Sequence, residues 1–72
     1  MKPARVRADF PTDGNMIPLA YRTDDGFSAK KIDRVLSRID TGYDEMTFRC
    51  ISDGKEITLM FNGRTWTVWE GN

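Results

Sequence analysis

Hydrophobic and polar residues alternate in three runs between residues 45 and 69, and two glycine-containing turns separate the runs. Asp53-Gly54 and Asn62-Gly63 are favoured sequences for two-residue type I′ hairpin loops, in which both loop residues have positive φ. A loop at 53–54 pairs residues whose numbers sum to 107, and a loop at 62–63 pairs residues whose numbers sum to 125. Both registers collect the apolar side chains on one face, which predicts a three-stranded antiparallel meander.

The meander is expected to have one apolar face and one mixed face. On the mixed face, threonines and charged residues surround three large apolar side chains, Ile51, Met60 and Trp69, and the second register sets Trp69 opposite Glu56. Either the N-terminal strands cover these three side chains by closing a barrel, or the three form an exposed surface for a partner. The apolar face carries Met46, Phe48, Cys50, Ile57, Leu59, Trp66 and Val68.

Two glycines of this region differ in their expected tolerance to substitution. Gly63 needs positive φ in its turn, so a β-branched side chain there is expected to cost more than about 1 kcal/mol. Gly71 is the penultimate residue, and the same replacement there is expected to cost almost nothing.

A second alternation, at the N-terminus, predicts another hairpin. Pro11 and Pro18 have no N–H to donate to a ladder, so at least one side of this hairpin is expected to be a sheet edge or to contain a bulge. Counted with the loop at Asp13-Gly14, paired residues sum to 27, which predicts three core-facing pairs: Phe10 with Ile17, Ala8 with Leu19, and Val6 with Tyr21.

The segment between residues 24 and 44 has two interpretations. Ile32, Val35, Leu36 and Ile39 have the i, i+3, i+4, i+7 spacing of a helix, which Ser28 would cap and Gly42 would end. The same four residues are mostly β-branched, and Asp24-Asp25-Gly26 is a hairpin signal, which favours a long strand with one bulge. The pattern therefore leaves open an all-β fold and an α+β fold, in which a helix over residues 28–39 packs on a five-stranded antiparallel sheet.

Five segments carry a family resemblance: residues 4–10, 13–18, 25–26, 32–36 and 64–66, with the sequences ARVRADF, DGNMIP, DG, IDRVL and RTW. They resemble segments of a small uncharacterised protein family from Firmicutes. In that family, an aromatic-x-Asp-Gly turn leads into the IDRVL segment as strand follows strand. The resemblance thus implies an all-β fold, a small six-stranded antiparallel meander or barrel built from consecutive hairpins, and it implies no activity.

Composition limits the chemistry that this chain can perform. The 72 residues fit one small β domain, residues 1–72, and eleven basic residues balance eleven acidic ones. The chain has no His and one Cys, which excludes His-based nucleophilic sites, zinc clusters and internal disulfides. Cys50 falls on the apolar face, where a thiol is an inert small hydrophobe. We therefore expect no enzyme activity, no cofactor and no metal site.

Hydropathy also bears on location. No apolar run approaches the roughly 20 residues that span a bilayer, and the alternating residues 1–7 do not resemble a signal peptide. We expect a soluble, cytoplasmic protein without a membrane partner.

Charge is unevenly distributed along the chain. Residues 1–38 contain eight basic and five acidic side chains, and residues 39–72 contain three basic and six acidic ones, so the halves carry +3 and −3. Small barrels that bind single-stranded nucleic acid typically combine a basic groove with aromatic platforms. Near Tyr21 or Phe27, such a groove would use Arg5, Arg7, Lys30, Lys31 and Arg34, unless these residues are simply a solvated face.

These features lead to two hypotheses about function. The favoured one is a small protein-interaction or self-associating module without catalytic activity, in which Ile51, Met60 and Trp69 contact a protein partner or a second copy in a homodimer. The oppositely charged halves and an edge strand open to pairing favour this hypothesis. The alternative is a small barrel that binds single-stranded nucleic acid.

Overall fold

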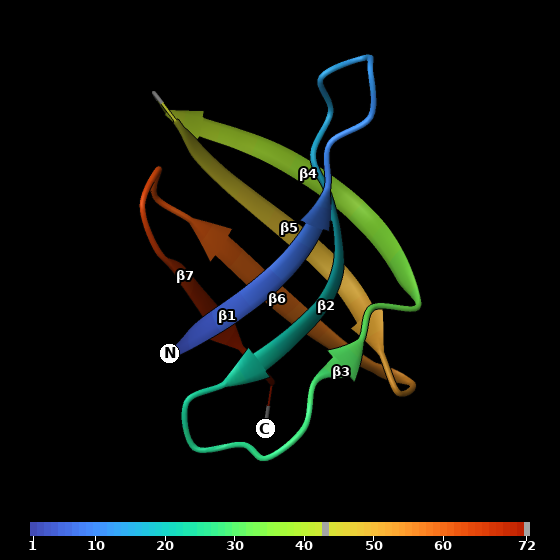
Figure 1. Ribbon diagram of the computed structural model, residues 1–72, viewed down its shortest axis with the longest axis vertical. Coiled ribbons are helices and arrows are strands. Elements are labelled where there is room, and N and C mark those ends of the chain that lie inside the picture. The colour runs from blue at the N-terminus through green and yellow to red at the C-terminus, as the bar shows by residue number, and fades with distance from the viewer. Residues whose placement is uncertain (43, 72) are drawn as a thin grey trace.

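Seven antiparallel strands form a single curled sheet, a half-barrel, in the order β3-β2-β1-β7-β6-β5-β4 (Figure 1). The structure is a computed structural model that describes residues 1–42 and 44–71. The all-β prediction is confirmed, with seven strands in place of six. The strands are β1 (Lys2–Asp9), β2 (Ile17–Thr23), β3 (Lys30–Lys31), β4 (Arg34–Gly42), β5 (Glu45–Ser52), β6 (Lys55–Phe61) and β7 (Trp66–Trp69).

The β5–β6 hairpin has the predicted register. Its loop residues Asp53 and Gly54 have φ values of 54° and 74°, as a type I′ turn requires. The apolar side chains consequently oppose one another across the ladder: Met46 faces Phe61, Phe48 faces Leu59, and Cys50 faces Ile57.

The β6–β7 hairpin differs from its predicted register by two residues. Leu59 pairs with Val68 and Trp69 pairs with Thr58, so the loop covers residues 62–65 and the expected pairing of Trp69 with Glu56 is wrong. The Asn62 side chain causes the longer loop, because its Oδ1 accepts hydrogen bonds from the backbone N–H groups of residues 64 and 65 at 2.9 and 2.8 Å. A shift of two leaves every side chain on its predicted face.

The N-terminal hairpin follows the predicted register only in part. Val6 pairs with Tyr21, but a bulge next to Pro18 leaves Leu19 unpaired with β1, and Ala8 then pairs with Pro18. The expected bulge is thus confirmed, whereas the three core-facing pairs are reduced to one. Beyond the bulge the side chains change face, and the loop covers residues 10–16. Phe10, Ile17 and Leu19 are 71%, 42% and 41% exposed.

The middle segment forms a strand corner, and residues 28–39 contain no helix, so the α+β alternative is wrong. Ile32 and Asp33 connect the two-residue strand β3 to β4 at opposite ends of the sheet. The Ile32 N–H donates to the Leu19 carbonyl and the Asp33 N–H donates to the Ile51 carbonyl, both at 2.8 Å. The corner therefore links β2 to β5 and draws the two ends of the half-barrel together.

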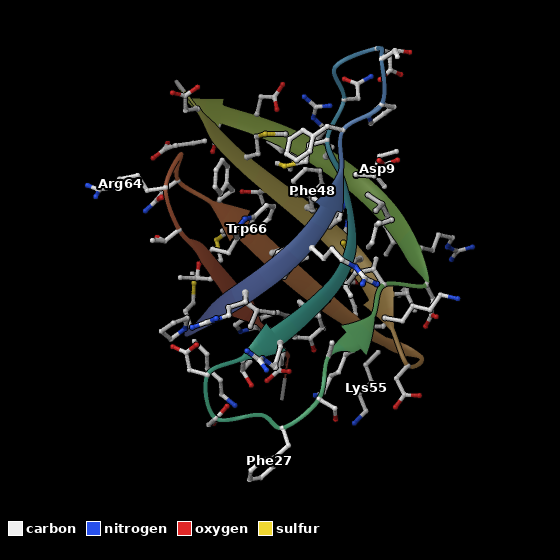
Figure 2. The ribbon with its side chains drawn as sticks, viewed as in Figure 1. Asp9, Phe27, Phe48, Lys55, Arg64 and Trp66 are labelled. Atoms are coloured by element: carbon white, nitrogen blue, oxygen red, sulfur yellow. The ribbon has the colours of Figure 1, made fainter. Side chains whose placement is uncertain are left out.

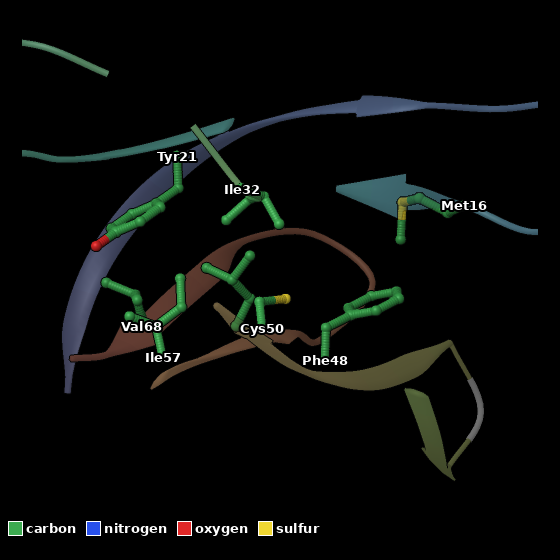
Figure 3. Close-up of a cluster of buried hydrophobic side chains, with 8 residues drawn as sticks. Met16, Tyr21, Ile32, Phe48, Cys50, Ile57 and Val68 are labelled. Carbon is green, nitrogen blue, oxygen red and sulfur yellow. The ribbon is translucent and has the colours of Figure 1, made fainter. Parts of the chain in front are cut away.

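The interior of the half-barrel is a compact apolar core. Figure 3 shows Tyr21 and Ile32 on one side of this core and Ile57, Cys50 and Val68 on the other. Trp66 packs at its margin, with its ring centroid 4.8 Å from that of Phe61 and 6.0 Å from that of Phe48. The fully buried side chains include Phe48, Leu59 and Val68.

Candidate nucleic-acid interface

The outer face of β1, β2 and β3 gathers basic side chains. Alternate residues of β1, among them Val6, pack toward the core, so Arg5 and Arg7 point to the outside. Arg22 of β2 lies opposite Arg5 in the ladder. Ala20 of β2 lies between Arg7 of β1 and Lys31 of β3, so Lys31 is on the same face as Arg7. We call this set, Arg5, Arg7, Arg22 and Lys31, the basic face.

The basic face contains a direct conflict between like charges. Arg5 and Arg22 are partners in the antiparallel ladder, where side chains of the same charge destabilise the sheet. Natural proteins tolerate such local conflicts mainly at functional sites. An anion placed between the two arginines would offset this repulsion.

A hollow of about 320 Å³ is lined by three of these cations, Arg5, Arg7 and Arg22. Ala20 is directly opposite both Arg7 and Lys31 in the ladder, and it is only 7% exposed. A lining that combines two alanines with three arginines suits a compact anionic group such as a phosphate. The lining residues are Arg5, Val6, Arg7, Ala20, Tyr21, Arg22 and Ala29.

Carboxylates do not neutralise the basic face. Within residues 1–42 and 44–71, no carboxylate oxygen lies within 4.0 Å of a side-chain nitrogen of its four members. Four other cations, Lys2, Lys30, Arg38 and Arg49, do form ion pairs. Asp9 lies two positions beyond Arg7 on β1 and limits the positive surface at that end.

Two exposed phenylalanines lie at opposite ends of the β1–β2 hairpin. Phe10 follows the last residue of β1, and Phe27 lies in the loop after the last residue of β2. Because the two strands are antiparallel, these positions are at opposite ends of the hairpin. Phe27 is fully exposed, and its ring points away from the body of the molecule (Figure 2). The basic face thus has an exposed aromatic ring beyond each end.

Two residues of the predicted basic groove lie elsewhere. Lys30 is adjacent to Lys31 in β3 and therefore points to the opposite side, where its Nζ is 3.3 Å from Glu70 Oε2 and 5.8 Å from the centroid of the Tyr21 ring. Arg34 lies on β4, opposite Ile51 and beyond the corner. Arg5, Arg7 and Lys31 remain together, so three of the five predicted residues share the face.

Glu70 organises a separate polar cluster at one end of the barrel. Its carboxylate accepts a hydrogen bond from the Tyr21 hydroxyl at 2.8 Å and lies near the ammonium groups of Lys30 and Lys2, at 3.3 and 3.4 Å. The Tyr21 hydrogen bond, followed by those from the two lysines, lowers the pKa of Glu70. Burial, with a smaller contribution from Glu70, raises the pKa of Tyr21. This cluster joins the first three strands to the C-terminal end.

The three predicted interaction residues all lie on the outer face of β5, β6 and β7. Met60 and Trp69 are diagonal neighbours, because Met60 pairs with Thr67. The ion pair between Arg49 and Glu56 separates Ile51 from Trp69, and Arg49 Nη2 is 2.9 Å from Glu56 Oε2. Trp69 is half exposed, and Gly71 packs against its ring. Their apolar surface is therefore small and interrupted.

The sequence reasoning missed Arg22 and Phe10 as members of the candidate site. A signal for Arg22 was present, because the register that sums to 27 sets it opposite Arg5. Phe10 was assigned to the core because the alternation was extended past Asp9, whereas β1 ends at Asp9 and Phe10 belongs to the following loop.

Comparison with protein-family models, curated proteins and solved structures finds no match. The resemblance to the small Firmicutes family therefore stays a prediction. In the described part of the chain, no helix is long and apolar enough to cross a membrane. Nor do the described residues contain a group of three or more acidic or Cys side chains suited to a metal ion.

Proposed function

We propose that this protein binds nucleic acid through the basic face, with backbone phosphates as the groups contacted. The observation that carries the proposal is the Arg5–Arg22 pair, two cations at facing positions of a ladder that form no ion pair among the described residues. Phosphate contacts supply most of the affinity of sequence-independent nucleic-acid binding.

Local charge, and not the net charge of zero, decides whether such a face attracts a polyanion. All four members of the basic face come from the positively charged half of the sequence. Arg5 and Arg7 are two positions apart on one strand, a separation of about 7 Å, which is comparable to the distance between successive phosphates of an extended strand. A row of cations with this spacing supports contacts to neighbouring phosphates.

Binding can be tested with the double substitution Arg5→Ala and Arg22→Ala. The matched control replaces Lys55 and Arg64 by alanine, two exposed cations outside the basic face (Figure 2). Fluorescence anisotropy with a labelled single-stranded oligonucleotide should show tight binding for the wild type and the control and weak binding for the double variant. Equal affinities of the two double variants would contradict the proposal.

A second proposal is the protein-interaction or self-associating module. The half-exposed Trp69 with Met60 beside it supports this function, as does β4, a nine-residue edge strand. It ranks second because β4 is interrupted by two register shifts and carries Arg38 and Asp40 opposite core-facing residues, which are devices that limit edge pairing. Light scattering should then give a dimer mass that Met60→Asp reduces to that of a monomer. A monomer mass at every concentration would exclude a homodimer.

We also propose that the protein acts in the cytoplasm and without catalysis. The single, buried, free cysteine suits a reducing compartment. The absence of His from the sequence supports a binding role without acid–base chemistry near neutral pH. Localisation of a tagged protein by microscopy tests the first statement.

A further inference from the structure

We infer that the ligand is a single strand, and that Phe10 and Phe27 stack on bases at the two ends of the basic face. The inference rests on the proposed function and adds the class of nucleic acid. It starts from the geometry of the hairpin, which orders the contacts along one line: Phe10, then Arg7 with Lys31, then Arg5 with Arg22, and finally Phe27.

The two rings lack a packing role that would explain their size. Phe10 is 71% exposed and Phe27 is fully exposed, and neither belongs to the apolar core. A turn closed by the hydrogen bond from the Gly26 N–H to the Thr23 carbonyl, at 3.0 Å, leads into Phe27. The loop therefore presents this ring to solvent, two residues before Ala29, which lines the hollow.

Exposed rings select for unpaired bases. In a duplex the faces of the bases are stacked on one another, so an aromatic side chain reaches them only by unstacking a base step, which costs about a few kcal/mol. In a single strand every base has a free face, and stacking on an aromatic side chain is tolerant of sequence. The combination of rings and uncompensated cations thus favours single strands without strong sequence preference.

The distance between the rings sets the length of strand that is bound. From Phe10 to the Arg5–Arg22 pair, β1 covers about five residues, or about 17 Å at about 3.3 Å per residue, and the loop to Phe27 adds to this. Asp24 and Asp25 lie in that loop and would repel phosphates, so the last contact there is to a base. We expect affinity to rise with oligonucleotide length up to about 4 to 6 nucleotides and then to level off.

The decisive experiment compares three ligands: a short oligothymidine, the same strand in a duplex, and a baseless strand of equal length from which every base is removed. Phe10→Ala with Phe27→Ala should weaken oligothymidine binding by about fivefold or more and leave binding to the baseless strand unchanged. Leu36→Ala, a truncation of an exposed side chain on β4, is the control and should bind like the wild type. Thermal unfolding of the phenylalanine variant verifies that it is folded.

The outcomes separate the inference from the proposed function. If the phenylalanine variant binds oligothymidine like the wild type, or if wild-type protein binds the duplex equally well, the stacking inference is overturned. The proposed function survives either result, provided that Arg5→Ala with Arg22→Ala still weakens binding. If the wild type binds none of the three ligands, the proposed function fails as well.

Discussion

At the scale of single residues, burial determines the chemistry of Cys50. Its side chain is fully buried between Phe48 and the facing strand, and burial raises the pKa of the thiol to about 11. The thiolate is the reactive form, so the folded protein should resist a disulfide reagent at about pH 8 and react only as fast as it unfolds. Absorbance during labelling, with and without denaturant, measures this rate. Labelling of the folded protein at the rate of a free thiol would contradict the assigned burial.

Gly71 has a role that its place next to the C-terminus does not reveal. Its φ is +61°, and a Cβ atom there would lie 2.9 Å from a ring carbon of Trp69, so the expectation of free tolerance is wrong.

Gly71→Val should displace this residue from the ring and make Trp69 more accessible, which acrylamide quenching of fluorescence measures. The control is Gly54→Val, which has the same backbone strain but no ring nearby and should lower the melting midpoint without changing the quenching. Equal quenching in the two variants would argue against the contact.

At the scale of elements, sheet register explains which predictions succeeded. The β6–β7 register is wrong by two residues, and its faces remain correct because side chains alternate with a period of two. The bulge at Leu19 is an error of one residue, and it reverses the face of Ile17, whereas Phe10 is exposed because it lies beyond the end of β1. A pattern of hydrophobic and polar residues detects neither the longer turn built by Asn62 nor the extra residue beside Pro18, since both depend on backbone hydrogen bonds.

The like-charged pair across β1 and β2 gives a prediction about stability. Arg22→Thr removes the repulsion from Arg5 and introduces a residue that favours strands, so the free protein should melt at a higher temperature than the wild type. The same change should weaken oligonucleotide binding, a trade of stability for function. Calorimetry and anisotropy on the same samples measure both. A lower melting temperature would show that Arg22 has a structural role.

The Glu70 cluster ties strands together in a manner that depends on pH. The pKa of Glu70 is lowered in the folded protein, so its contribution to stability is present above the ordinary pKa of a glutamate, about 4.3, and is lost as the pH falls through the folded value. Urea unfolding across this range should show the wild type losing stability more steeply than Glu70→Gln or Tyr21→Phe. The same pH dependence in all three proteins would contradict this role.

At the scale of the whole molecule, the sequence predicted the fold class correctly, but it predicted only some of the residues of the basic face. Turn sequences and alternation predicted an all-β chain, but β3 has only two residues and no periodicity can indicate it. Lys30 and Lys31 were placed in one groove while the segment had no assigned structure. Both lysines lie in β3, where adjacent side chains point to opposite faces of the sheet. Lys31 therefore belongs to the basic face, and Lys30 forms an ion pair with Glu70 on the other face.

The central claim is that phosphates contact the basic face, and the salt dependence of binding tests it most directly. Anisotropy titrations of the wild type and of Arg5→Ala with Arg22→Ala should be run against one single-stranded oligonucleotide at several salt concentrations. If both arginines contact phosphates, the slope of log K against log salt should be flatter in the double variant by about 1.4, since each contact to a single strand contributes about 0.7. Identical slopes for the two proteins would contradict the claim.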